Sequence, residues 1–134
     1  MESPYRFLAH TTFREQVEAF LDKHSDHWNA LQSKCRQACV DPTNAGETLH
    51  GIVHPQLIGK IYKAWVGGRR KFRLVYLFHS GRKVVLPVLI TLDLRSNINW
   101  NDLPWQEYAE AIYADLTSNN TKAFQDWTDS LTTL

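Results

Sequence analysis

The sequence predicts a single α+β domain whose elements follow in the order β-α-α-β-β-β-α. Three observations lead to this prediction: two amphipathic helical patterns near the N-terminus, three strand-like segments in the middle of the chain, and one further helical pattern near the C-terminus. The expected architecture is an antiparallel sheet with a helical hairpin packed on one face and the other face left free. A chain of 134 residues suits one domain of this kind, with residues 117–134 as a C-terminal extension.

The first two elements are predicted to be a short strand and a helix. Tyr5–His10 is short and partly alternating, which favours a strand. Over residues 11–24, apolar side chains recur with a helical period. We expect Thr11 or Thr12 to cap this helix, because Glu15 stands three residues after Thr12, as in a capping box.

A second helix is predicted over residues 25–40, and it places Cys35 and Cys39 on one face. Pro42 and Gly46 are expected to end it. Neither the two cysteines nor the six histidines show the spacing of a metal site. We therefore expect buried, reduced cysteines, and we predict no metal and no cofactor.

The middle of the chain is predicted to hold three strands. Residues 59–68 and 71–80 alternate between the two faces of a sheet, and residues 80–83 form the turn of a hairpin. Residues 84–94 are almost continuously apolar, which is typical of a central strand. Because proline cannot donate a backbone hydrogen bond, we expect a bulge or an unpaired position at Pro87.

The last predicted helix spans residues 105–116. Its apolar stripe is expected to consist of Tyr108, Ile112 and Leu116. The tail that follows has a weaker pattern and could dock as a half-helix. The side chains expected to dock it are Phe124, Trp127 and Leu131.

The charges are distributed unevenly along the chain, although the net charge is only +1. Residues 60–92 hold eight basic side chains and no acidic one, while the segments on either side are net acidic. Alternation along the strands would bring Lys63, Lys71 and Arg73 together on the free face. Such a block favours binding of a polyanion, and the alternative is a solvated hairpin balanced by the acidic segments.

Segments for targeting or membrane insertion are not evident. No apolar run approaches the roughly 18 residues that a membrane span needs. The N-terminal residues lack the architecture of a signal peptide. We therefore expect a cytoplasmic protein with no membrane partner.

Taken in order, these segments resemble the RelE/ParE superfamily of bacterial toxin–antitoxin toxins, and the YhaV-type mRNA interferases most closely. The resemblance spans roughly residues 5–116. It lies in a short strand, two helices and a "DP" break, followed by "ETLHG", "IYKAWVGGRRKFRLVY", "KVVLPVLITLDLR" and "WQEYAEAIYADL". The dipeptide Asp126–Trp127 matches a "DW" near the end of YhaV-type toxins.

The resemblance implies a RelE-like fold and a metal-independent endoribonuclease that cuts mRNA, in RelE-type members on the ribosome, and so stops translation. An acidic antitoxin protein would neutralise it. The residues that match the family's catalytic positions are Arg73, Arg95, Tyr108 and Lys63. The residues expected to contact RNA are Arg69, Arg70, Lys71, Arg82, Lys83 and Trp65.

The implied chemistry is attack of the RNA 2′-hydroxyl on the adjacent phosphorus. Arg73 would stabilise the charge on the phosphorane, with Lys63 as a supporting cation and Tyr108 orienting the nucleotide. The general acid and base stay unassigned. His79 titrates closer to neutrality than Tyr108, but six strand residues, or about 20 Å, separate it from Arg73.

Two other classes of function remain open. ParE-type members of the superfamily share the fold but poison DNA gyrase, and a plain binding module would grip nucleic acid or an acidic protein without chemistry. Individual residues also have structural alternatives. Arg73 could form a surface ion pair with the acidic C-terminal segment, Tyr108 could be a core residue, and Trp65, Trp100 and Trp105 could pack inside rather than stack on bases.

Overall fold

The computed structural model describes residues 5–48, 61–66, 72–91 and 104–129. Four predicted site residues lie outside these ranges, and so does Trp100. The four are Arg69, Arg70, Lys71 and Arg95.

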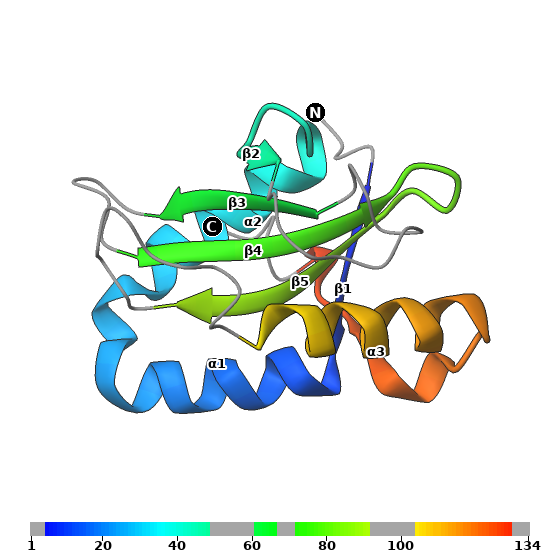
Figure 1. The fold of residues 1–134 in the computed structure, drawn as a ribbon. Helices are drawn as coiled ribbons and strands as arrows, with labels where there is room; N and C mark the ends of the chain where they lie inside the picture. The colour runs from blue at the N-terminus through cyan, green and yellow to red at the C-terminus, as the bar shows by residue number, and fades with distance from the viewer. Residues whose placement is uncertain (1–4, 49–60, 67–71, 92–103, 130–134) are drawn as a thin grey trace.

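The described elements contain the predicted order together with additional short pieces (Figure 1). They are β1 (Arg6–His10), α1 (Thr11–His24), η1 (Ser25–His27), α2 (Trp28–Val40), β2 (Glu47–Thr48), β3 (Ile61–Val66), β4 (Phe72–His79), β5 (Val84–Thr91), α3 (Trp105–Thr117), η4 (Thr121–Ala123) and β6 (Phe124–Asp126). The strands β2 and β6 were not predicted. Each is only two or three residues long, too short for a periodic pattern to show.

The strands form one mixed sheet in the order β2-β3-β4-β5-β1-β6. The strands β3, β4 and β5 are antiparallel neighbours, as predicted, and Figure 1 shows them side by side with the β4–β5 turn at one end. The prediction of a wholly antiparallel sheet is wrong, because β1 pairs with β5 in parallel. No tight turn joins β1 to β5, so nothing local sets their relative direction.

Helices cover both faces of the sheet, which corrects the expectation of one free face. The helices α1 and α2 pack on one face, around Phe7, Leu74 and Tyr76. On the other face, α3 packs against Val75 and Leu77. The predicted helical hairpin therefore holds, but the third helix closes part of the face expected to be open.

The strand β5 is apolar throughout because helices cover it on both sides. The predicted irregularity at its proline is confirmed. Val75 of β4 faces Leu89, whereas the next residue, Tyr76, faces Pro87, so Val88 has no opposite partner on β4. This is a β-bulge next to Pro87, where the regular pairing of the two strands is interrupted.

The cap of α1 differs from the prediction. Neither threonine is the cap: His10 is, and its Nδ1 accepts the Thr12 backbone N–H at 3.2 Å. The two cysteines of α2 are free and buried, as predicted. Burial raises the pKa of the Cys35 thiol strongly and that of Cys39 to about 12.

The tail after α3 also differs from the prediction. Residues 124–126 form β6, antiparallel to β1, instead of a half-helix. Trp127 does dock as expected, and its ring stacks on Phe7 at a centroid distance of 6.4 Å. Among the described helices, none combines the length and apolarity that crossing a membrane requires.

Candidate functional site

Two neighbouring strands place three of the predicted site residues on one face. Trp65 of β3 lies directly opposite Arg73 of β4, and Lys63 lies opposite Val75. Directly opposite residues share a face in an antiparallel pair. Lys63, Trp65 and Arg73 therefore lie together on the face that also carries α3.

The Arg73 guanidinium lies over the Trp65 ring, 4.0 Å from its centroid. This cation–π contact orients the guanidinium and takes up one face of the indole. Arg73 is only 7% exposed, while Lys63 and Trp65 are partly exposed beside it. The first side chains that a ligand meets at this site are therefore Lys63 and Trp65.

An acidic side chain from outside the basic block approaches this site. Glu47 of β2 lies directly opposite Lys63 of β3, and it is exposed. The charge pattern along the chain could not reveal this neighbour, because the two residues are far apart in sequence. The carboxylate lowers the local positive potential at Lys63.

The helix α3 brings one predicted site residue and one aromatic candidate to the same face. Tyr108 is partly buried and packs against the α3-side core. Trp105 is fully buried, at 0% exposure, so its ring is core and cannot stack on a base. The buried stripe of α3 consists of Trp105, Ala109, Ile112 and Leu116, with Tyr108 at its margin.

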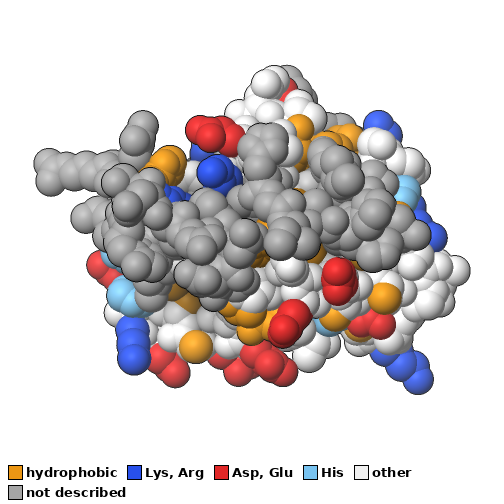
Figure 2. All heavy atoms as spheres, in the orientation of Figure 1, with side chains coloured by type: hydrophobic (Ala, Val, Ile, Leu, Met, Phe, Trp, Pro, Cys, Tyr) orange, Lys and Arg blue, Asp and Glu red, His pale blue; other side chains and the backbone are white. Residues whose placement is uncertain are grey.

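The two other described cations of the basic block, Arg82 and Lys83, lie at the opposite end of β4. Arg82 and Lys83 occupy the exposed β4–β5 turn, separated from Arg73 by the length of β4, about 20 Å. Lys83 lies over the ring of Tyr5 at 5.3 Å, with a positive φ of 55°. Figure 2 shows Lys and Arg side chains near this turn and acidic ones along the opposite edge. The described cations of the basic block are thus divided between the two ends of β4.

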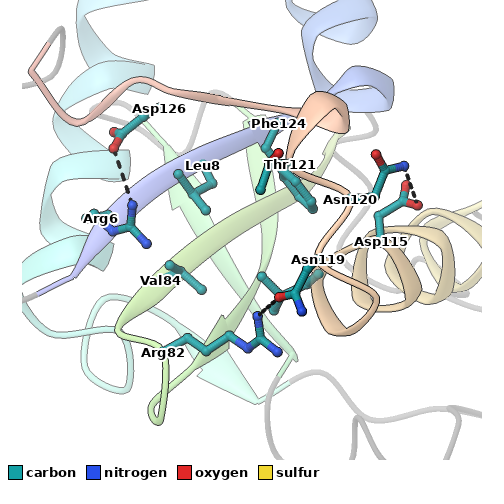
Figure 3. Close-up of a pocket in the computed structure, with 11 residues that line it drawn as sticks. Arg6, Leu8, Arg82, Val84, Asp115, Asn119, Asn120, Thr121, Phe124 and Asp126 are labelled. Carbon is teal, nitrogen blue, oxygen red and sulfur yellow. Dashed lines mark hydrogen bonds and ion pairs between the residues drawn. The ribbon is translucent and has the colours of Figure 1, made fainter.

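A pocket of about 240 Å³ lies beside the turn, and sequence reasoning did not find it (Figure 3). Arg6 of β1 and Arg82 both line it. The pairing of β1 with β5 sets Arg6 opposite Val84 and so brings the two arginines together. No local pattern in the sequence marks Arg6, because its neighbourhood depends on this long-range parallel pairing.

A pair formed by the buried His10 and the partly exposed Asp115 borders the same pocket. The Nδ1 of His10 accepts the Thr12 N–H, so Nε2 carries the proton and donates to Asp115 at 2.6 Å. This bond holds the pKa of Asp115 below its usual range. Both ring nitrogens are engaged within the protein, so the pair ties β1 to α3 and does not present a catalytic base.

Within the residues that the structure describes, no group of three His, Cys, Asp or Glu side chains is placed to hold a metal ion. Comparison of the chain with known protein families, with characterised proteins and with solved structures gives no match.

Proposed function

We propose that this protein is an endoribonuclease toxin of the RelE/YhaV type, which cleaves mRNA in the cytoplasm and is neutralised by an acidic antitoxin. The observation that carries the proposal is the group Lys63, Trp65 and Arg73 on one face of two adjacent strands. Of these positions, Lys63 and Arg73 match the family's strand residues, whereas Trp65 stands where RelE itself has a second strand lysine. Action on the ribosome belongs to the same proposal.

In the proposed reaction the 2′-hydroxyl of the RNA attacks the adjacent phosphorus, leaving a 2′,3′-cyclic phosphate and a 5′-hydroxyl. RNA supplies its own nucleophile, so this route requires no metal. Arg73 donates to two phosphate oxygens as charge builds on them, because its planar fork matches their geometry. Trp65 holds the guanidinium in place, and Lys63 adds a second positive charge.

The burial of Arg73 sets a condition on this mechanism. With 7% of the residue exposed, RNA has to uncover the guanidinium when it binds over Lys63 and Trp65. The proposal therefore expects that loss of Lys63 weakens RNA binding, whereas loss of Arg73 lowers the rate of cleavage of bound RNA.

The test is cleavage of mRNA by the purified protein, with and without ribosomes, read by primer extension as new 5′ ends. We expect Arg73→Lys to keep the charge but lower the rate about 10²- to 10³-fold, since the bidentate contact is lost. Arg36→Ala on α2 is the matched control, because Arg36 lies on a helix of the opposite face. Thermal melting of each variant shows whether the fold is kept.

Full activity of a folded Arg73→Ala variant would overturn the catalytic assignment. Altered DNA supercoiling with intact RNA would identify a gyrase poison instead. Binding of RNA without new 5′ ends, under all conditions including ribosomes, would identify a binding module.

A further inference from the structure

The pocket beside the β4–β5 turn is lined by residues from both halves of the chain (Figure 3). Its apolar lining consists of Leu8, Val84, Leu116 and Phe124. Its polar rim includes two arginines, two aspartates and the segment 119–121 that follows α3. A ligand for this site therefore needs an apolar body as well as a charged group.

The two arginines of the rim can accept an anion. The Arg82 guanidinium donates to a neutral partner, the Oδ1 of Asn119, at 3.0 Å. The Arg6 guanidinium lies 3.8 Å from Asp126, which is longer than a hydrogen bond. Figure 3 shows the Arg6 guanidinium paired with Asp126 and the Arg82 guanidinium turned toward Asn119. Both residues are exposed, so a ligand can reach them.

The two aspartates of the rim are held by other groups. Asp115 accepts from His10 through one oxygen and from Asn120 through the other, at 2.6 and 3.2 Å. Asp126 accepts the backbone N–H of Thr128 at 2.9 Å. These internal bonds fix both carboxylates in place. The two negative charges offset the two positive charges of the arginines, so electrostatic attraction alone does not select a bare anion. An anion that is attached to an apolar body gains additional contacts with the apolar lining.

We propose that this pocket binds one nucleoside monophosphate unit. The phosphate lies between Arg82 and Arg6, and the base and ribose lie on the apolar lining. The amides and hydroxyl of Asn120 and Thr121 offer hydrogen bonds to the polar edge of the base or to the ribose. A volume of about 240 Å³ suits one such unit with its phosphate left at the rim.

The nucleotide could be free or part of an RNA strand, and both sources present the same chemistry to the pocket. The site lies about 20 Å from Arg73 along β4. It is therefore separate from the proposed cleavage site, and binding there does not depend on the proposed function.

The test is titration of the full chain with adenosine monophosphate, followed by calorimetry and by backbone amide shifts of Asn119, Asn120 and Thr121. Arg82→Gln and Arg6→Gln are each expected to weaken binding about tenfold or more, the loss of a charge-assisted contact. Lys122→Gln is the matched control, because Lys122 is the exposed neighbour of Thr121 but does not line the pocket. Thr121→Trp should block the site without a change of charge.

The outcomes separate the possibilities. The proposal would be overturned if inorganic phosphate or adenosine bound as tightly as the nucleotide, or if Lys122→Gln weakened binding as much as Arg82→Gln. If Arg82→Gln also lowers the affinity for an RNA oligonucleotide, the pocket binds a nucleotide of an RNA strand. If the affinity for the oligonucleotide is unchanged, the ligand is the free nucleotide. Arg73→Lys should leave nucleotide binding intact, so failure of the cleavage proposal would not remove this one.

Discussion

At the scale of single residues, His10 at the end of β1 contacts three other elements. Its Nδ1 caps α1, its Nε2 binds Asp115 of α3, and its ring packs edge-on against Phe124 of β6 at 5.2 Å. A threonine cap could have closed the first turn of α1 equally well, but it could not have reached α3. The histidine therefore joins three elements that local sequence preferences treat separately.

The bond between His10 and Asp115 predicts a pH-dependent contribution to stability. Because the pKa of Asp115 is lower in the folded state than in the unfolded chain, its stabilising effect is present above the unfolded pKa, near 4, and is lost as the pH falls through the folded pKa. We expect Asp115→Asn to lower the free energy of unfolding by about 1 kcal/mol at pH 7, and by progressively less as the pH falls from about 4 through the lowered folded-state pKa of Asp115. Urea denaturation across this pH range checks this, with Asp22→Asn on the exposed side of α1 as control.

The two buried thiols predict slow chemistry in the folded protein. Burial raises the pKa of both Cys35 and Cys39, so little thiolate exists near pH 8. We expect a thiol reagent at pH 8 to react at least about 100-fold more slowly with the folded protein than with the urea-unfolded chain. Because a raised thiol pKa favours the folded state only while the thiols stay protonated, stability should fall as the pH rises above about 9. Rapid labelling of the folded protein would contradict the observed packing of α2.

At the scale of elements, the last described segment is an integral part of the sheet. The strand β6 pairs with β1, and the Phe7 N–H donates to the hydroxyl of Thr128 at 2.8 Å. Trp127 then stacks on Phe7 and contacts Phe13 of α1. The stretch expected to be an extension thus covers an edge of β1 that would otherwise have unpaired backbone groups.

Trp127 is expected to contribute measurably to the stability of the whole domain. Trp127→Ala removes a partly buried ring from two aromatic contacts and should cost about 2–3 kcal/mol, whereas Trp127→Phe should cost less than about 1.5 kcal/mol. Lys122→Ala, at an exposed position shortly before β6, is the control. If Trp127→Ala unfolds at the same urea concentration as the parent chain, the Trp127 ring does not stabilise the domain.

At the scale of the whole molecule, the described cations of the basic block lie in two groups, one near each end of β4. One end carries Lys63 and Arg73 beside Trp65, and the other carries Arg82 and Lys83 beside the pocket. A single-stranded polyanion long enough to span about 20 Å could contact both ends. Neither end reaches the other, so their contributions to binding should be nearly independent.

This division predicts how salt affects RNA binding. If three phosphates are neutralised, affinity should fall about 20-fold between 50 and 200 mM salt, because the slope for single strands is about −0.7 per phosphate. Arg82→Gln should reduce the slope of log affinity against log salt by about 0.7. The part of the slope that is due to Lys63 should stay unchanged. Filter binding across the salt range checks both values, and a flat salt dependence would rule out a phosphate-based interface.

Much of the fold could be predicted from particular residues. The alternation in β3 and β4 defined which side chains share a face, and the continuous apolar run of β5 marked a central strand. Pro87 marked the bulge because its missing N–H is a local property. The strand β6 and the cap of α1 were missed, because they depend on pairing with β1 and on contact with α3.

The sequence by itself determined the α+β class, the helical hairpin, the three antiparallel strands and the shared face of Lys63 and Arg73, since the alternation of side chains along a strand is a local property of the chain. Only the tertiary structure decided that β1 enters the sheet in parallel, that α3 covers the second face, that Arg73 is buried against Trp65, and that Arg6 meets Arg82 at a pocket. These features depend on contacts between residues far apart in the chain. Local preferences do not distinguish the possible arrangements, and the free energy of burying apolar surface selects among them.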